Sequence, residues 1–478
     1  MAHAAYKFRL YPNATQERAL ASHLETLRQV YNAALAYRID YYTETGKSLK
    51  QGELYKLFAS LRNLQLEDQK AGGAGPHWLT HVSAVSVRDT CARVEVAFDN
   101  FFRRLKQKAG KAGFPRFKGY GRLRSIPFEN TYPAGCVLRT AKGELAGTAI
   151  KNKSGRGCRD VPAARKGYRL DVFGTGRIKV IAHRDIVGVV KTACVERDVD
   201  GKWYVVLVSQ YEAEPAPEST KPPVGIDVGL ESFLTRSDGV QRPNPKHLKS
   251  KLKVLRRVQR AASRKIEAAK KRKQKFRECK NLKKAFHKVA KLHVRVRNLR
   301  KEHHHKEANA LVNEFGTICA EKLNIRGMVK NGKLARTISD AAWGGFLIVL
   351  KHKAAKAGVR FVEVDAKRTS QTCPQCGAVA KKKLSQRRHK CSCGLDIHRD
   401  HAAALVVLQR GTGSTGGGPL PAVGGSPPNP VGMPSGRERS GGGRGRQRKT
   451  NAKSTVPKVP KANRSRKVSQ TPTIPGME

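Results

Sequence analysis

Acidic residues are scarce in this chain. Its 478 residues include 37 Asp and Glu against 95 Lys and Arg, which gives a formal net charge of +58. Such an imbalance predicts a polyanion as the partner, bound through contacts that salt weakens steeply. Self-repulsion on this scale also leads us to expect a protein that is seldom found alone.

Long apolar runs are missing as well. No uninterrupted run reaches the ~18 residues that a transmembrane helix needs, and no charged segment followed by an apolar one opens the sequence. We therefore expect no membrane partner and a cytoplasmic protein associated with the bacterial nucleoid. Aromatic residues make up only 6% of the chain, although its length predicts roughly three domains with sizeable cores.

Cysteines are few and mostly scattered. Six of the ten stand singly, and four cluster: Cys373, Cys376, Cys391 and Cys393. In a basic cytosolic protein this pattern argues against a disulfide framework and indicates free thiols plus one metal site. Four thiolates from two knuckles suit a closed, structural Zn²⁺. The first knuckle reads C-x-x-C, but the second reads C-x-C, one residue shorter than the usual ribbon.

The N-terminal half predicts a strand, a group of helices and then a set of short strands. Residues 1–12 alternate apolar and basic residues, as in a half-buried strand. Helical apolar spacing within 13–110 predicts a helical lobe whose two apolar stripes pack together, with Thr15 as the first cap. Residues 111–213 predict a small antiparallel barrel that the N-terminal strand completes.

Aromatic and cationic residues interleave in a glycine-bounded segment that contains Arg116, Phe117 and Lys118. Such a segment can stack on bases and neutralise phosphates. It can equally anchor a loop on the protein core through its aromatic rings. The sequence leaves both interpretations open.

The C-terminal half predicts an α/β layer of RNase H-like type. After a Pro-rich linker at 214–223, the order over 224–371 is strand, basic helical insertion, strand, helix and strand. The insertion, 246–306, has two helical patterns with densely basic faces, which favour a hairpin that tracks phosphates over a merely solvated surface. Four of its arginines are expected nucleic-acid contacts: Arg256, Arg257, Arg260 and Arg264. Three successive histidines at 303–305 point to different sides of a helix, so a shared ion is not expected.

Boundaries within this half follow from the same patterns. We expect one strand at 314–321 and a single amphipathic helix at 338–357. The cysteine insertion occupies 372–394, and 395–410 supplies the last element of the layer. From 411 to 478 the composition becomes rich in Gly, Pro and Ser and then in Arg and Lys, which predicts a disordered basic tail.

Three isolated carboxylates stand at strand ends or at the start of a helix: Asp227, Glu321 and Asp400. Two Mg²⁺ ions about 4 Å apart must be clamped by anionic oxygens, so this set suits a two-metal phosphodiesterase. One ion would lower the pKa of an attacking water and the other would stabilise the leaving 3′ oxygen. The products would carry 5′-phosphate and 3′-hydroxyl ends.

Each carboxylate also has an ordinary structural interpretation. Asp227 can simply end a strand, whereas Glu321 can pair with Lys322 or Arg326. Asp400 can cap the helix that it opens, because a helix N-terminus tolerates an anion. Two nearby acids are alternative ligands of lower rank: Asp365 and Asp396.

Six segments, in their order and spacing, resemble the TnpB family, the OrfB-type proteins of bacterial insertion sequences that are ancestral to compact type V CRISPR effectors. The segments are YKFRLYP (6–12), GFPRFK (113–118), GIDVG (225–229), AEKL (320–323), TSQTCPQCG (369–377) and RD (399–400). Two positions depart from the family pattern. His398 stands where the family often has Asp, and Ala402 stands where it often has Asn.

The resemblance implies a multidomain α+β protein. Its parts would be an N-terminal β-barrel wedge with a helical recognition lobe, a RuvC nuclease domain and a zinc-ribbon insertion that binds target nucleic acid. Asp227, Glu321 and Asp400 would be the catalytic triad. A guide RNA, held by one or two protein copies, would pair with one strand of double-stranded DNA beside a short motif that the protein reads.

The expected function is therefore an RNA-guided, Mg²⁺-dependent DNA endonuclease. Two other functions stay open. One is an RNA-guided DNA-binding protein or repressor with little cleavage, and the other is a guide-independent transposase or resolvase.

Overall fold

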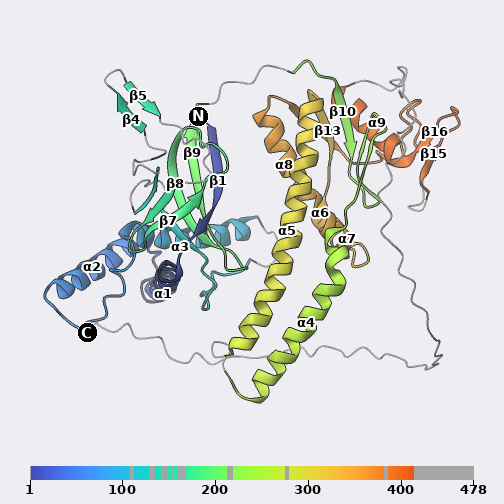
Figure 1. The fold of residues 1–478 in the computed structure, drawn as a ribbon. Coiled ribbons are helices and arrows are strands. Elements are labelled where there is room, and N and C mark those ends of the chain that lie inside the picture. The colour runs from blue at the N-terminus through green and yellow to red at the C-terminus, as the bar shows by residue number, and fades with distance from the viewer. Residues whose placement is uncertain are drawn as a thin grey trace. The chain divides into compact units, whose positions relative to one another are not determined.

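The structure is a computed structural model. It describes residues 2–107, 112–128, 135–140, 146, 149–152, 155–158, 167–212, 219–274, 279–381 and 386–413. All described elements fall within the unit Met1–Val423, and Figure 1 follows the chain through them. The second unit, Gly424–Glu478, lies outside the described residues, and so does nearly all of the predicted tail.

Three helices follow the first strand. The bounds are β1 Ala2–Tyr11, α1 Ala14–Thr45, α2 Gln51–Lys70 and α3 Ala84–Lys106. The predicted apolar stripes of α1 and α3 bury their side chains in one shared cluster, which confirms that the two helices pack together. The predicted cap, Thr15, is wrong. Asn13 caps α1, because its side chain accepts the Gln16 amide hydrogen while the Gln16 side chain accepts that of Asn13.

A seven-stranded antiparallel sheet takes the place of the predicted barrel. Its further strands are β2 Ser125–Phe128, β3 Cys136–Arg139, β6 Arg169–Val172, β7 Gly176–Ile181, β8 Val189–Arg197 and β9 Trp203–Tyr211. The order is β2-β8-β9-β1-β7-β6-β3, so β1 lies between β9 and β7, as the completed barrel required. Among the described residues the end strands β2 and β3 are not paired, which leaves a near-barrel. A separate hairpin joins β4 Ala149–Asn152 to β5 Gly155–Cys158.

The C-terminal half contains a five-stranded mixed sheet. Its strands are β10 Pro223–Asp227, β11 Ser232–Arg236, β12 Gln241–Pro243, β13 Thr317–Lys322 and β14 Arg360–Asp365, in the order β12-β11-β10-β13-β14. The first three strands are antiparallel, whereas β10, β13 and β14 are parallel. Ile226, Phe233 and Ile318 of this sheet pack with Phe346 in a buried core. This is the mixed α/β layer that the sequence predicted.

Helices complete this half of the chain. They are α4 His247–Lys271, α5 Lys280–Glu314, α6 Ile325–Met328, α7 Ala335–Ala341, α8 Trp343–Lys356 and α9 Arg399–Thr412. The two long helices α4 and α5 pack together as the predicted hairpin (Figure 1). In the parts of the chain that the structure describes, no helix combines the length and apolar character needed to cross a bilayer.

Three predicted boundaries are wrong. The strand expected from 314 starts at Thr317, because α5 continues to Glu314, whose carboxylate pairs with Arg236 at 2.6 Å. The single helix expected at 338–357 is two helices, α7 and α8, because Ala342 between them takes a left-handed conformation with φ of 53°. Finally, α9 runs to Thr412, past the expected end at 410.

Close packing of α9 on the sheet depends on Gly225 in β10. A Cβ atom at this position would lie 2.1 Å from the carbonyl oxygen of Ala404 in α9, a distance that no side chain tolerates. The helix presents small buried residues to the sheet, among them Ala403 and Ala404. Glycine on the strand and alanine on the helix therefore bring the two backbones together two residues from Asp227.

Candidate active site and metal centre

The three predicted carboxylates come from three elements that meet at one end of the five-stranded sheet. In the parallel pair β10 and β13, Ile226 lies opposite Ala320, so Asp227 and Glu321 follow side by side at the carboxyl ends. Asp400 is the second residue of α9, which packs on both strands. Its Oδ2 lies 3.7 Å from where a Cβ atom of Gly229, just after β10, would stand.

The charges of Glu321 and Asp400 both act on Asp227. Burial raises the pKa of Asp227 well above its usual range, and the charges of Glu321 and Asp400 raise it further. Burial also raises the pKa of Glu321. Arg399 is an opposing cation here, since its Nε lies 3.8 Å from Asp400 Oδ1 and its charge lowers the pKa of Asp227. This centre carries more negative charge than its protein neighbours neutralise, which favours a bound cation.

The donor set fits Mg²⁺, because carboxylate oxygens are the hard ligands that this ion prefers. Among the described residues, the four cysteines are the one group of potential ligands gathered tightly around a single point. The carboxylates do not form such a group. Two ions about 4 Å apart need carboxylate ligands that are spread over a wider space than the ligands of one ion.

The structure gives Glu321 a different partner from the predicted ones. Its Oε1 accepts a hydrogen bond from the Thr369 hydroxyl, and no described ion pair joins it to Lys322 or Arg326. The Arg410 guanidinium lowers the pKa of Glu321 from a greater distance. The ordinary salt-bridge interpretation of this carboxylate is therefore not supported.

Helix capping does not account for Asp400 either. The N-cap of α9 is His398, whose Nδ1 accepts the Asp400 backbone N–H at 3.3 Å. The Gln241 amide nitrogen lies 3.2 Å from the same imidazole nitrogen. Asp400 itself is buried, with 7% of its surface exposed. Its carboxylate thus acts on Asp227 while a residue that departs from the family pattern caps the helix.

The lower-ranked acids have other partners. The Asp396 carboxylate pairs with Arg388, 2.7 Å from its Nε, in the hairpin of β15 Arg388–Lys390 and β16 Asp396–His398. Asp365 Oδ1 accepts the Lys367 backbone N–H at 3.1 Å. Both acids are exposed, in contrast to Asp400.

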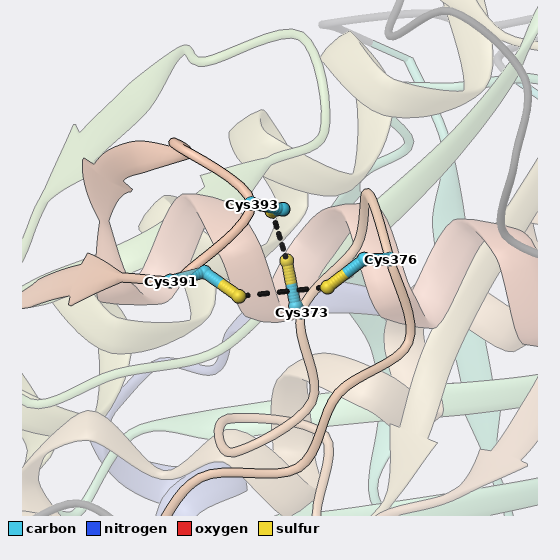
Figure 2. Close-up of side chains that lie close together, drawn as sticks. All are labelled: Cys373, Cys376, Cys391 and Cys393. Carbon is cyan, nitrogen blue, oxygen red and sulfur yellow. Dashed lines mark hydrogen bonds between the residues drawn. The ribbon is translucent and has the colours of Figure 1, made fainter.

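The four cysteines converge as predicted (Figure 2). All four Sγ atoms lie within 4.8 Å of one another, with 3.7 Å between Cys373 and Cys393 and 3.5 Å between Cys376 and Cys391. A tetrahedral ion with Zn–S bonds of ~2.3 Å has sulfur–sulfur edges of about 3.8 Å. The shortened second knuckle therefore still supplies a set that fits Zn²⁺.

Local turns explain why the short knuckle works. Gly377 and Gly394, which follow the two knuckles, have φ of 74° and 89°, values that favour glycine. Each closes a turn back onto a cysteine: the Gly377 N–H donates to the Cys373 carbonyl at 3.0 Å, and the Gly394 N–H donates to that of Cys391 at 3.1 Å. Hydrogen bonds, the Cys393 backbone first, lower the pKa of Cys391 to about 6, whereas burial raises the pKa of Cys373 to about 12.

Sequence reasoning missed three residues that connect the two sites. The Thr369 hydroxyl bonds Glu321, the Gln409 side-chain amide donates to the Pro374 carbonyl at 2.6 Å, and Arg410 Nη1 donates to two carbonyls of the turn after β14. Thr369 lies inside the quoted TSQTCPQCG segment, which was a signal that it matters. Gln409 and Arg410 carry no comparable signal in the sequence.

The predicted nucleic-acid residues fall into two groups. All four arginines of α4 are exposed, opposite the buried Leu255. Lys118, by contrast, is anchored: its backbone pairs with the Asn32 side chain at 2.7 and 3.0 Å, and its Nζ lies 3.8 Å from the Tyr31 ring centre. Phe117 remains 58% exposed. The segment thus combines an anchor with an exposed aromatic ring.

One histidine of the run at 303–305 packs in the core. His304 is buried and its Nε2 lies 3.1 Å from the Ala341 carbonyl oxygen. Its ring stacks on Phe233, with 5.7 Å between ring centres. His304 is therefore a core residue.

Fold and site first define a class: a strongly basic α/β protein with carboxylates at the end of a mixed sheet and a four-cysteine site, features typical of metal-dependent nucleases. Three family models match parts of the chain. Residues 1–47 match a "Helix-turn-helix domain" and residues 194–332 a "Probable transposase", both of the OrfB type, and residues 343–407 match a "Cas12f1-like, TNB domain".

Curated relatives then identify the family. A Streptomyces pristinaespiralis protein named "Putative RNA-guided DNA endonuclease" is 31% identical over 410 residues, 85% of this chain and 89% of the relative. The InsQ protein of Escherichia coli K12, with the same descriptive name, is 25% identical over 403 residues, 81% of this chain and 87% of its own. The chain belongs to this TnpB family.

Among solved structures, the chain is similar to a mini-RNA-guided endonuclease, CRISPR-Cas_phi3. That likeness has 10% sequence identity and a TM-score of 0.46, and it covers 88% of this chain and 93% of the other.

Proposed function

We propose that this protein is an RNA-guided DNA endonuclease that cuts DNA complementary to its guide RNA beside a short flanking motif. The observation that carries the proposal is the meeting of Asp227, Glu321 and Asp400 at one sheet end, in a family whose members bear that name. In a protein that only binds DNA, this partly buried cluster of acids would destabilise the fold without serving a function.

The sheet supports a RuvC assignment for the catalytic domain. Three antiparallel strands followed by two parallel ones, in the order β12-β11-β10-β13-β14, fit an RNase H-like fold. Asp227, between the other two acids, would be the ligand shared by both Mg²⁺ ions. When bound, these ions supply an activated water and stabilise the leaving 3′ oxygen.

The protein's own residues hold the reacting geometry. The Thr369 hydroxyl hydrogen-bonds one oxygen of Glu321, and His398 caps the first turn of α9, which carries Asp400. Close packing at Gly225 sets the distance between α9 and the strand of Asp227. A side chain thus contacts Glu321, and helix capping and close packing place the backbones that carry Asp400 and Asp227, which supports an ordered metal site.

In this proposal, exposed positive charge contacts the nucleic acids and the cysteine site holds a structural metal ion. The exposed arginines of α4 would neutralise phosphates of the guide RNA or of its heteroduplex, while base pairing reads the sequence. The cysteine site would hold one structural Zn²⁺, and metal analysis of the purified chain is expected to return one zinc per chain. Finding no zinc in a folded, active protein would remove that part of the proposal.

Cleavage with the co-purified RNA tests the proposal. Once that RNA has been sequenced, a matching DNA duplex is supplied with Mg²⁺. Asp227→Ala is expected to reduce cleavage by at least about 100-fold, because removing one group that stabilises developing charge costs about 10²–10³ in rate. Glu363→Ala is the matched control, since this exposed acid lies in β14 of the same sheet and pairs with Lys351, and it should cut like the parent.

Other outcomes select other functions. An Asp227→Ala variant that cuts as well as the parent would show that the site is wrong. Tight, guide-dependent binding without cleavage in any divalent ion would identify a repressor. Cleavage that survives RNase treatment would favour a guide-independent enzyme.

A further inference from the structure

We propose that Thr369 is a positioning residue that holds the Glu321 carboxylate in its metal-binding orientation. The inference rests on the proposed function, since it concerns the geometry of a proposed metal ligand. Nothing in the sequence separates Thr369 from the other hydroxyl residues of its segment. Its contact with a residue 48 positions away does so.

The contact is buried and directional. Thr369 is 3% exposed, and its Oγ1 is within reach of both Glu321 Oε1 and the Ala366 carbonyl oxygen, the latter at 3.2 Å. A hydroxyl has one proton to donate, and a carboxylate is the stronger acceptor. Among the described residues, Thr369 is the one side chain that hydrogen-bonds Glu321. Without it, the carboxylate loses the partner that selects its rotamer.

The backbone around Thr369 is fixed from the side of the cysteine site. Arg368 takes φ of 61°, and its carbonyl accepts hydrogen bonds from the backbone N–H groups of Gln371 and Thr372, each at 3.0 Å. This turn leads directly to Cys373, which is 1% exposed and donates its N–H to the Ala378 carbonyl at 2.8 Å. Thr369 therefore sits one short turn before a rigid knuckle.

Helix α9 holds the same segment from the other side. Arg410 Nη1 donates to the carbonyls of Asp365 and Lys367, each at 2.9 Å, and Gln409 donates to that of Pro374 at 2.6 Å. These bonds bracket Thr369 in the sequence. Helix α9 also carries Asp400 in its first turn. The segment around Thr369 is therefore bonded both to Glu321 and to the helix that carries Asp400. A hydroxyl so firmly placed can position a ligand rather than follow it.

The energetic consequence is confined to the metal site. Loss of a hydrogen-bond partner that orients a metal ligand typically costs 10–100-fold in metal affinity or activity. Thr369→Val keeps the branched shape and removes the hydroxyl. Thr369→Ser keeps the hydroxyl. Thr372→Val removes a neighbouring hydroxyl that bonds the Arg368 carbonyl at 2.9 Å and does not touch Glu321.

The test uses the full chain with its co-purified RNA. The half-saturating Mg²⁺ concentration for cleavage is expected to rise about 10-fold or more in Thr369→Val, while Thr369→Ser and Thr372→Val stay near the parent. Tightly bound Mn²⁺ is counted by electron paramagnetic resonance, with Asp227→Ala giving the background from RNA. Thr369→Val should lose Mn²⁺ toward that background, yet keep the parent's zinc content and DNA affinity.

Two results would overturn the proposal. One is a Thr369→Val variant with the parent's Mg²⁺ dependence and Mn²⁺ count. The other is a variant that loses zinc and DNA binding in proportion to cleavage, which would make Thr369 a purely structural residue. If the parent itself cuts no DNA, the proposed function fails, but the Mn²⁺ count still decides whether Thr369 holds Glu321.

Discussion

Asp227 carries a stability penalty that can be read from its surroundings. Burial, followed by the charges of Glu321 and Asp400, raises its pKa in the fold above the unfolded value of ~3.9. The fold then binds the proton more tightly than the unfolded chain does. Below the unfolded pKa both states are protonated and the penalty vanishes, whereas above the folded pKa the buried charge destabilises the fold in full.

Asp227→Asn should therefore stabilise the metal-free protein at pH 7 while it abolishes cleavage. We expect the melting temperature to rise by a few degrees, since ~1 kcal/mol corresponds to roughly 2–4 °C in a domain of 150–250 residues. The gain should shrink as the pH falls toward 4, and added Mg²⁺ should favour the parent, which binds it. Thermal unfolding across pH, with and without Mg²⁺, measures all three effects.

Asp396→Asn is the control of opposite sign. Its pairing with Arg388 lowers the pKa of Asp396, so removing its charge should not stabilise the fold at pH 7. A lower melting temperature of Asp227→Asn than of the parent, in metal-free buffer at pH 7, would contradict the electrostatic account of this centre.

Single residues also show how far sequence reasoning reaches. Asp227 and Glu321 were predictable as neighbours because each ends an apolar strand, and parallel strands bring such ends together. The cap of α9 was not predictable, because histidine is an uncommon N-cap residue, whereas aspartate, which stands at position 400, is a common one. The contact between Thr369 and Glu321 was out of reach for another reason: the two residues lie far apart in sequence, and no local pattern encodes their contact.

The hairpin of α4 and α5 is the element that most clearly serves a polyanion. The buried residues of α4 are spaced by seven, at Leu255, Ala262 and Ala269, so a narrow seam suffices to hold it against α5. Most of its exposed residues are Lys and Arg, and Glu267 is the single acid of the helix. Charge that pairs with nothing on its own helix remains available to phosphates.

Removing four of these charges should change the salt dependence of RNA binding more than its specificity. The variant carries Arg256→Gln, Arg257→Gln, Arg260→Gln and Arg264→Gln. Each lost phosphate contact reduces the slope of log K against log salt by about 1, so a reduction of up to about 4 is expected. Binding of the co-purified RNA at several salt concentrations measures the slope.

Glu267→Gln provides the matched control on the same helix, because it removes the one negative charge. It should leave the slope unchanged or increase it and should strengthen binding slightly. An unchanged slope in the fourfold variant would place the RNA elsewhere on the protein.

Element boundaries were harder to predict than element types. The periodicity of 338–357 continues through Ala342, so it predicts one helix, yet the left-handed backbone there divides it into α7 and α8. The residues after Asn313 are apolar enough for a strand, but α5 runs on to Glu314, where Arg236 from β11 holds its end. In both places tertiary contacts decide where a regular pattern stops.

On the scale of the whole molecule, the sequence pattern predicted both sheets, but it did not predict that the end strands β2 and β3 would stay unpaired among the described residues. Local alternation was enough for most strands of the near-barrel. Pairing of β1 with β9 joins segments almost two hundred residues apart, as in Leu10 opposite Trp203. Composition offered a different kind of information, since a net charge of +58 acts on the molecule whatever the details of its fold.

That charge should give the protein opposite responses to salt with and without its RNA. Alone, the chain repels itself, and salt screens this repulsion over a Debye length of about 10 Å at 0.1 M, so the melting temperature should rise with salt. Bound RNA neutralises the same charge and stabilises the fold by RT ln(1 + [L]/Kd), a gain that falls as salt weakens binding. The melting temperature of the complex should therefore fall with salt and converge on that of the free chain.

Thermal unfolding of the complex from ~0.05 to ~1 M NaCl, with an RNase-treated sample as the control, measures both curves. Parallel curves would mean that RNA binding does not depend on the excess of Lys and Arg, which would remove the charge argument from the proposed function.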